Sequence, residues 1–264
     1  MTTTISSVQN PKIKNIIKLH KSSERKKQGL FLIEGEKELE HALTSGYKLH
    51  SCFYYKDKIS ESLLTTIEKD KTVKKYEVTA EVFSKIAYRE NSGWIVAQAF
   101  PKNHDLDSLS LKKSPLVIVL ETVEKPGNLG AILRTADAAG VDAVIISDPT
   151  TDFYNPNVIR ASIGCVFSVN TASASSETVI NWLKKHHFKS YAAALQTNKF
   201  YDDYNYYGPT AFVMGTESVG LTEKWRKAVD HIIKIPMLGI NDSLNVSIAT
   251  AVLVYEALRQ RKKL

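Results

Sequence analysis

The 264-residue sequence predicts an α/β protein of two domains, and three features support this fold class. Short apolar runs alternate with amphipathic stretches along nearly the whole chain, which is typical of strands alternating with helices. Residues 101–115 interrupt this alternation with two prolines and several charges, as an interdomain linker would. The last long apolar stretch, residues 246–254, is apolar on nearly every helical face, which predicts a helix that is buried on nearly every face.

The first domain, residues 1–100, is expected to be a small α/β sandwich that begins with a basic helical lead-in. Isoleucines and a leucine recur through residues 11–27 as the core side of this lead-in, and Gly46 ends the helix after the first strand. The expected strands are residues 30–34, 49–55, 73–78 and 94–100, and the expected helices are 11–27, 36–43, 60–68 and 80–86.

The second domain, residues 116–264, repeats the alternation, which favours a mostly parallel sheet with helices on both faces. The expected strands are residues 116–121, 143–147, 166–171, 191–195, 211–214 and 232–235. The expected helices are residues 129–139, 157–163, 177–187 and 222–229, followed by the apolar helix near the C-terminus. Asn128 and Ser243 are the expected N-caps of the first and last of these helices.

Composition excludes several classes of protein. Hydrophobic content of 43% and charged content of 24% are typical of a soluble globular protein. No apolar run approaches the roughly 18 residues of a membrane span, and residues 1–10 lack a signal-peptide core, so we expect a cytoplasmic protein without a membrane partner. Cys52 and Cys165 match no metal-binding spacing, and the histidines form none either, so we expect reduced thiols and no metal.

The net charge of +7 is concentrated near the N-terminus, where Met1 to Lys27 holds seven lysines and arginines against one glutamate. A basic segment of this kind suits an anionic partner such as RNA, although a charge run can also be only a solvated helix face. The candidate RNA-binding residues in this segment are Lys18, Lys21, Arg25, Lys26 and Lys27.

Three segments of the second domain place polar residues next to the end of an apolar strand or the start of an apolar helix: residues 117–140, 211–221 and 235–258. They contain neither the GxGxxG spacing of a dinucleotide site nor a Walker lysine. The glycine-rich loop that binds phosphates in nicotinamide-dependent enzymes and in nucleotide hydrolases is therefore absent from these segments. Without further information, each of three polar residues in these segments has a purely structural interpretation. Asn128 would cap a helix, Arg134 would pair with Asp137 on an exposed helix face, and the Glu217 carboxylate would interact favourably with the positive end of a helix dipole.

Together and in this order, the three segments resemble the motifs of the SpoU/TrmH branch of the SPOUT RNA ribose 2'-O-methyltransferases, over roughly residues 115–260. The resemblance implies a C-terminal trefoil knot, formed by the chain from about Phe212 onward. The apolar helix at residues 246–254 separately predicts a homodimer, because a second copy of the chain is the simplest surface to cover its remaining faces. Residues 31–46 resemble the substrate-binding domain that precedes many SpoU-type catalytic domains. That domain is similar to small RNA-binding ribosomal proteins, which favours an RNA role for the basic lead-in.

The resemblance also implies a cofactor and the roles of individual residues. The cofactor would be S-adenosylmethionine, with its site at Leu195, Gly215, Ile235, Met237 and Leu244. The catalytic residues would be Asn128, Arg134, Glu217, Ser243 and Asn245. Arg160 lies in a further segment that resembles a family segment near the RNA site.

Ribose methylation depends more on how the ribose hydroxyl is positioned than on a reactive protein side chain. A ribose hydroxyl is a poor nucleophile near neutral pH, so it must be held in line with the methyl group and lose its proton as it attacks. No histidine lies near the three motifs as a base, and Arg134 is expected to bind the adjacent phosphate bidentately.

The expected function is therefore S-adenosylmethionine-dependent 2'-O-methylation of a ribose in structured RNA. The separate N-terminal domain favours ribosomal RNA over transfer RNA by analogy. Two alternatives remain: a non-catalytic RNA-binding or assembly protein that retains the fold, and a methyltransferase that acts on an RNA base. The Ser-Leu-Asn sequence of the third motif disfavours the second alternative.

Overall fold

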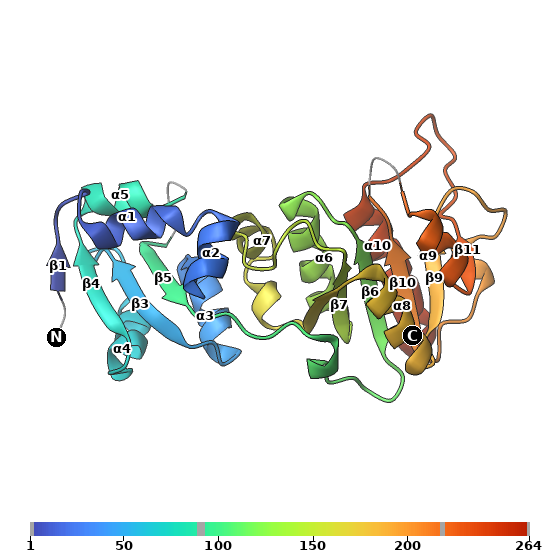
Figure 1. Cartoon of the computed structure of the whole chain (residues 1–264), viewed down its shortest axis with the longest axis horizontal. Helices are drawn as coiled ribbons and strands as arrows, with labels where there is room; N and C mark the ends of the chain where they lie inside the picture. The colour runs from blue at the N-terminus through green and yellow to red at the C-terminus, as the bar shows by residue number, and fades with distance from the viewer. Residues whose placement is uncertain (1–2, 89–92, 217–219, 263–264) are drawn as a thin grey trace. The chain divides into compact units, whose positions relative to one another are not determined.

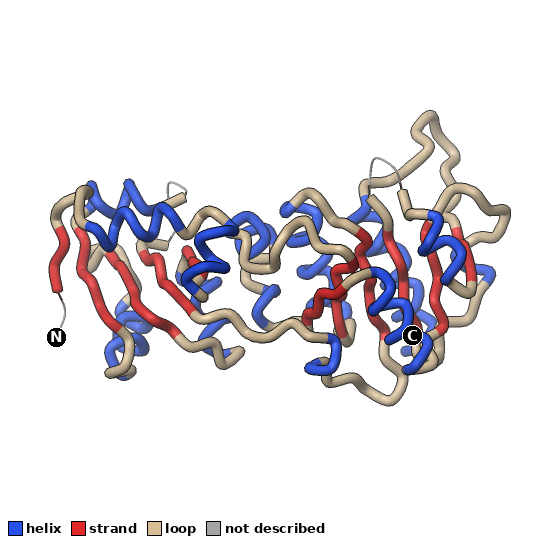
Figure 2. Tube along the Cα trace, viewed as in Figure 1, coloured by secondary structure: helices blue, strands red, loops and turns tan. Residues whose placement is uncertain are grey.

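The computed structural model describes residues 3–88, 93–216 and 220–262. The chain divides into two compact units: the first comprises Met1–Lys102 with Asp152–Ser168, and the second Asn103–Thr151 with Val169–Leu264. The sequence pattern places a single boundary at residues 101–115, whereas the structure returns residues 152–168 to the first unit. Each unit has its own sheet (Figures 1 and 2).

The first unit is a five-stranded sheet in the order β1-β4-β3-β5-β2. Its strands are β1 (Thr3–Ile5), β2 (Phe31–Glu34), β3 (Leu49–Tyr54), β4 (Lys74–Val78) and β5 (Ile95–Ala99). Its helices are α1 (Pro11–Lys18), α2 (Ser22–Gln28), α3 (Glu36–Thr44), α4 (Glu61–Lys69), α5 (Ala80–Ile86) and α7 (Pro156–Ala161). The four expected strands are confirmed, and β1 adds a parallel edge strand beside β4 that the sequence pattern does not reveal.

The basic lead-in forms two helices, so the single helix expected over residues 11–27 is wrong. Helix α1 ends at Lys18 and α2 begins at Ser22. At the break, the carbonyl groups of Leu19 and His20 accept hydrogen bonds from the Arg25 guanidinium, at 3.0 and 2.8 Å. These bonds stabilise a turn where a continuous helix would use the same carbonyls along its axis.

Aromatic rings explain why residues 152–168 belong to the first unit. Tyr154 stacks on Phe31 of β2 with ring centroids 4.1 Å apart, and Phe167 meets Tyr47 edge-on at 4.9 Å. The hydroxyl groups of Tyr47 and Tyr154 lie 3.3 Å apart in a buried hydrogen bond. Each aromatic pair contributes roughly 0.5–1.5 kcal/mol beyond the burial of its surface, so the segment is held by side-chain packing.

The strand expected over residues 166–171 is also wrong, because a short 3-10 helix, Cys165–Phe167, occupies its first half. Gly164 precedes it with a φ of +79°, and a Cβ there would lie 3.0 Å from the His41 ring. The chain therefore turns at a glycine packed against α3, and strand β8 begins only at Thr171.

The second unit is a six-stranded sheet in the order β11-β9-β10-β6-β7-β8, and all five of its strand pairs are parallel. Its strands are β6 (Leu116–Glu121), β7 (Ala143–Ser147), β8 (Thr171–Ala174), β9 (Lys189–Ala193), β10 (Thr210–Met214) and β11 (His231–Ile233). Its helices are α6 (Pro126–Ala139), α8 (Ser176–Lys185), α9 (Glu223–Ala228) and α10 (Val246–Lys262). The expected parallel sheet is confirmed.

Helices cover both faces of this sheet (Figure 1). Side chains of β6, β7 and β10 that point to one face form a core with α8 and α9, where Trp225 is 1% exposed. Helices α6 and α10 pack against each other on the opposite face, and α10 also contacts β10. The trefoil knot implied by the resemblance concerns how the chain threads, and it stays a prediction.

Helix α10 is only partly buried within one chain, although its sequence predicts burial on nearly every face. Leu253, Val254 and Ala257 are fully buried, whereas Ile248 and Tyr255 are 54% and 50% exposed. Within residues 3–88, 93–216 and 220–262, no helix combines the length and apolarity that a membrane crossing requires.

Candidate active site

A cavity of about 610 Å³ opens where strands β9, β10 and β11 end. Ligands of open parallel sheets bind beyond the carboxyl ends of the strands, and pockets for small ligands measure roughly 300–1,000 Å³. All five residues predicted to bind the cofactor line this cavity: Leu195, Gly215, Ile235, Met237 and Leu244. Two of the predicted catalytic residues, Ser243 and Asn245, line it as well.

Gly215 forms a wall of the cavity that tolerates no side chain. A Cβ at this position would lie 2.3 Å from the carbonyl carbon of Gly220 and 2.4 Å from the Leu221 nitrogen. Backbone hydrogen bonds between Thr216 and Gly220, at 3.2 and 3.1 Å, hold the two sides of this loop together. Glycine at this position therefore lets the two sides of the loop pack backbone against backbone at the edge of the cavity. Glu217, a predicted catalytic residue, lies outside the described residues.

A buried carboxylate ties this loop to the sheet. Glu121 ends β6 and is 3% exposed. It accepts hydrogen bonds from the Thr222 backbone nitrogen at 2.8 Å and from the Thr222 hydroxyl at 2.6 Å. Thr222 immediately precedes α9, so Glu121 determines where the loop ends and where α9 begins. Sequence reasoning gave Glu121 no such role, because its partner is 101 residues away.

Asn245 and Asn128 bring the third and first motif segments together. The Asn245 side-chain oxygen accepts from the Ser247 backbone nitrogen at 2.9 Å, which is an N-cap interaction for α10. The Asn245 amide nitrogen donates to the Asn128 side-chain oxygen at 3.2 Å. These two side chains therefore connect the rim of the cavity to the first turn of α6.

Both expected N-caps are wrong. Helix α6 begins at Pro126, two residues before Asn128, because proline is favoured at the first helical position and sets its φ for the helix. Ser243 lies before α10 and donates its hydroxyl to Asp242 at 3.0 Å, while Asn245 has the capping contact. Neither Asn128 nor Ser243 caps its helix: Asn128 accepts from Asn245, and Ser243 lines the cavity.

Arg134 lies on the exposed side of α6, about 9 Å along the helix axis from Asn128 at 1.5 Å per residue. Among the described residues, its guanidinium forms neither an ion pair nor a hydrogen bond, and the alternative pairing with Asp137 is therefore not formed. Arg134 does not line the cavity and shares only helix α6 with Asn128, so its part in the site stays a prediction.

Arg226 of α9 also lines the cavity, and sequence reasoning missed it. In the sequence it is one of several charged residues in an ordinary surface helix, and no motif singles it out. Lys234 lines the cavity too, with its ammonium group 5.1 Å from the centre of the Phe200 ring. The position of Arg226 and Lys234 at the cavity depends on how α9 and the segment after β11 are placed in the fold, which sequence periodicity does not reveal.

In the first unit, the basic residues of the lead-in separate into two kinds. Lys18, Lys21, Lys26 and Lys27 are exposed. Arg25 is 6% exposed and also donates to the Asp152 carboxylate at 2.6 Å. A guanidinium committed to two carbonyl groups and a carboxylate within the protein is a structural group, so the prediction that Arg25 contacts RNA is withdrawn.

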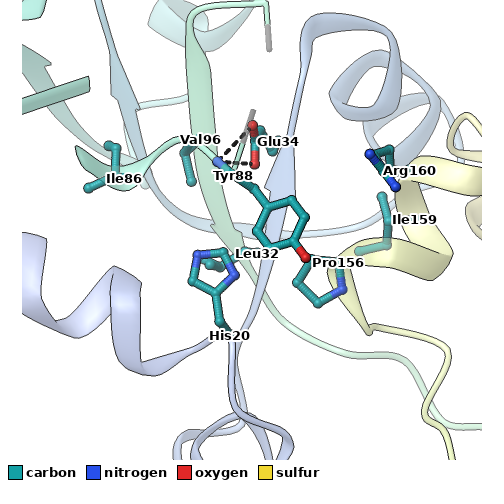
Figure 3. A pocket seen from close by; sticks show the side chains of 9 residues that line it. All are labelled: His20, Leu32, Glu34, Ile86, Tyr88, Val96, Pro156, Ile159 and Arg160. Atoms are coloured by element: carbon teal, nitrogen blue, oxygen red, sulfur yellow. Dashed lines mark hydrogen bonds between the residues drawn. The ribbon is translucent and has the colours of Figure 1, made fainter. Parts of the chain in front are cut away.

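Arg160 stands at the edge of a small cleft in the first unit (Figure 3). Tyr88 lies in this cleft, 50% exposed, with its backbone nitrogen donating to both oxygens of Glu34 and its hydroxyl accepting from Asn157. The His20 ring lies 5.6 Å from the Tyr88 ring. Burial, and secondarily the charge of Arg25, lowers the pKa of His20. Nothing in the sequence marks Tyr88 or His20, since the cleft is lined by residues from five separate segments of the chain.

Comparison with known proteins finds relatives for both units. Residues 115–255 match the SpoU rRNA Methylase family, and residues 10–97 match the MRM3-like substrate binding domain. The chain is 32% identical over 252 residues to the 23S rRNA (guanosine(2553)-2'-O)-methyltransferase RlmP of Bacillus subtilis (strain 168), covering 95% of this chain and 97% of that protein.

Two further relatives are similar over nearly the whole chain. The 23S rRNA (uridine(2479)-2'-O)-methyltransferase of Streptomyces viridochromogenes is 28% identical, covering 90% of this chain and 86% of that protein. The crystal structure of an AdoMet-bound rRNA methyltransferase from Sinorhizobium meliloti superposes with a TM-score of 0.88 at 31% identity, covering 98% of each chain.

Proposed function

The chain belongs to the SpoU rRNA methylase family, and we propose that it transfers the methyl group of S-adenosylmethionine to a ribose 2'-hydroxyl of ribosomal RNA. The observation that carries this proposal is the convergence of three distant segments, residues 117–140, 211–221 and 235–258, on one cavity and its rim. Relatives that methylate ribosomal RNA support the substrate class, and they also make the cytoplasm the expected compartment.

The cavity fits the proposed cofactor in size and in construction. Gly215 has no room for a side chain because the backbone of Gly220 and Leu221 packs against it, which keeps this loop closed beside the cavity. Backbone groups at Gly215, Ile235 and Leu244 would hold S-adenosylmethionine, and Leu195 and Met237 would add apolar surface. The AdoMet-bound relative from Sinorhizobium meliloti supports the same assignment.

The cofactor supplies an electrophilic methyl group on its sulfonium, and the protein supplies geometry. We assign Asn128 and Asn245, with Ser243, to holding the target ribose at the rim of the cavity, since their side chains meet there. Arg134 presents an exposed guanidinium fork that suits bidentate binding of the adjacent RNA phosphate. Glu217 completes the proposed catalytic residues.

The first unit would hold the RNA more broadly. Four exposed lysines, Lys18, Lys21, Lys26 and Lys27, provide positive charge for phosphates. Arg160 adds a cation beside the half-exposed ring of Tyr88, and exposed aromatic rings are suited to stacking on unpaired bases. This combination supports single-stranded or looped RNA as the contacted region.

A homodimer is part of the proposal, and the exposed face of α10 supports it. Ile248 and Tyr255, which are 54% and 50% exposed, leave large apolar surface uncovered on this helix. Apolar surface of this kind commonly marks a protein interface, and a second copy of the chain is the simplest partner. Light scattering should give about twice 29.5 kDa. Ile248→Glu should shift the mass toward one chain, whereas Glu223→Lys, at an exposed position of α9, should not.

The test of function is methyl transfer from labelled S-adenosylmethionine to ribosomal RNA and transfer RNA by the purified protein. The expected product is a nucleotide that resists alkaline cleavage at its 3' side, because the 2'-hydroxyl is blocked. Label found in a base would indicate the base-methylating alternative. RNA binding without any transfer would indicate the non-catalytic alternative, and Asn245→Ala is the matched inactive control.

A further inference from the structure

Two anchors orient α9 so that Arg226 faces the cavity. Thr222, just before the helix, is bound by the buried Glu121 carboxylate. Trp225 is buried, and its indole nitrogen donates to the Ser176 hydroxyl at 3.0 Å. Because consecutive helical side chains point about 100° apart, burying Trp225 turns Arg226 away from the core. Its terminal nitrogen Nη2 lies 3.8 Å from where a Cβ on Gly220 would stand.

The Arg226 guanidinium holds this position without a partner in the part of the chain that the structure describes. Within that part, its Nε is buried and has no hydrogen-bond partner. Among the same residues, its terminal nitrogens also form no hydrogen bond and no ion pair. Arg226 as a whole is only partly buried, and its terminal nitrogens are the donors at the cavity. An unpaired guanidinium that is held at a cavity indicates an anionic ligand group that pairs with it.

The positive charge of Arg226 indicates that the ligand group it pairs with is anionic. The charged side chains that line the cavity within the described residues are Arg226, Lys234 and Asp242. The Lys234 ammonium group lies over the Phe200 ring, and Asp242 accepts from Ser243. S-adenosylmethionine carries a sulfonium, an ammonium and one carboxylate, so the carboxylate is its only anionic group. A planar guanidinium matches a carboxylate with two parallel hydrogen bonds.

We propose that Arg226 forms a carboxylate-binding subsite that receives the amino acid end of the cofactor. The subsite rests on the proposed function, because it assumes S-adenosylmethionine in this cavity. It extends the cofactor site beyond the backbone groups that the family motifs indicate. It also gives α9, which carries no motif residue, a direct part in selecting ligands with an amino acid group over other adenosine compounds.

The experiment is calorimetric binding of three ligands to the full-length protein without RNA. The ligands are S-adenosylmethionine, its decarboxylated form, and 5'-methylthioadenosine, which lacks the amino acid group. Wild-type protein should bind S-adenosylmethionine at least about tenfold more tightly than the decarboxylated form, because the latter loses both charge-assisted hydrogen bonds to the guanidinium. Arg226→Ala should remove this preference and leave the affinity for 5'-methylthioadenosine unchanged.

Two variants make the result specific. Arg226→Lys retains the charge without the fork and should recover only part of the preference. Lys227→Ala, on the same helix but exposed and paired with Glu223 at 2.7 Å, should change nothing. Thermal unfolding of each variant checks that α9 remains folded.

Each adverse outcome has a distinct meaning. A preference that persists in Arg226→Ala would overturn the subsite, as would an equal loss for all three ligands, which would place Arg226 against the adenosine or in the fold. Wild-type protein that binds no S-adenosylmethionine would instead overturn the cofactor assignment itself.

Discussion

Arg25 in the first unit and Arg226 in the second are both withdrawn from solvent at Nε, but their terminal nitrogens differ. Those of Arg25 donate to two carbonyl groups and to Asp152, so the side chain completes a turn. Those of Arg226 bond to nothing among the described residues and face a cavity. Pairing, and not charge or burial alone, therefore separates a structural arginine from one that awaits a ligand.

The regions around the two arginines differ in the same way. The lead-in carries exposed lysines whose attraction for phosphate acts over several ångströms and depends weakly on geometry. The cavity and its rim depend on the close packing of Gly215 against Gly220 and on the hydrogen bond between Asn128 and Asn245. Small displacements of such groups change how reacting atoms are aligned. We therefore expect substitutions around the cavity to abolish methyl transfer, and substitutions in the lead-in to weaken RNA binding gradually.

The largest expected effect is that of Arg134→Ala on methyl transfer. Removing the guanidinium that binds the phosphate should lower the single-turnover rate by about 10²- to 10³-fold with RNA saturating, because the ribose is no longer held in line. Arg134→Lys should recover little of the rate, since lysine lacks the planar fork.

Calorimetry should show unchanged S-adenosylmethionine affinity in both Arg134 variants, and Asp137→Ala is the neighbouring control. A near wild-type rate in Arg134→Ala would remove Arg134 from the proposed catalytic residues and erase the contrast between the two regions.

Arg25→Met should destabilise the first unit by roughly 2–3 kcal/mol, because it leaves two carbonyl groups without their donor and Asp152 with only the Ser22 hydroxyl. Lys26→Met, one residue away and exposed, should change stability by less than about 0.5 kcal/mol. Chemical denaturation followed by circular dichroism measures both. Equal small effects would return Arg25 to the RNA-binding lysines.

Neutralising Lys18, Lys21, Lys26 and Lys27 together to glutamine should weaken RNA binding without changing cofactor affinity. The slope of log affinity against log salt should become shallower by roughly 0.7–0.9 for each phosphate that the lysines no longer neutralise. Filter binding over a range of salt concentrations measures the slope.

The matched control neutralises four exposed lysines elsewhere in the same unit, Lys56, Lys58, Lys69 and Lys71. An identical change in slope for both sets would show that only total charge matters and that the lead-in does not bind RNA specifically.

The smallest expected effect concerns pH. Because burial lowers the pKa of His20 from about 6.5, the folded protein binds fewer protons at this site than the unfolded chain does. Its contribution to stability is therefore complete above about pH 6.5 and declines as the pH falls below that value.

The melting temperature of wild type should accordingly fall more between pH 7.5 and pH 5.5 than that of His20→Gln. A parallel fall in the two proteins would show that other groups account for the pH dependence.

Most of the second unit was predictable, because each buried strand is a short apolar run and most helices have one apolar face, while the last helix is apolar on nearly every face. The cavity residues were found through motif resemblance, since Ile235 and Leu244 look like core residues without it. The N-cap assignments failed for a local reason. Several polar residues near each helix start could cap it, and the proline at Pro126 and the hydrogen bond of Asn245 decided which one does.

Local patterns in the sequence therefore determined the α/β class, the order of the elements, the basic lead-in and the motifs that identify the family. The return of residues 152–168 to the first unit, the bonds that occupy Arg25 and the exposure of Arg226 to the cavity depended on the folded chain. Each of these joins groups far apart in sequence, such as Arg25 and Asp152, separated by 127 residues. Periodicity and propensity describe neighbours along the chain, so interactions of this kind appear only when side chains from distant segments pack together.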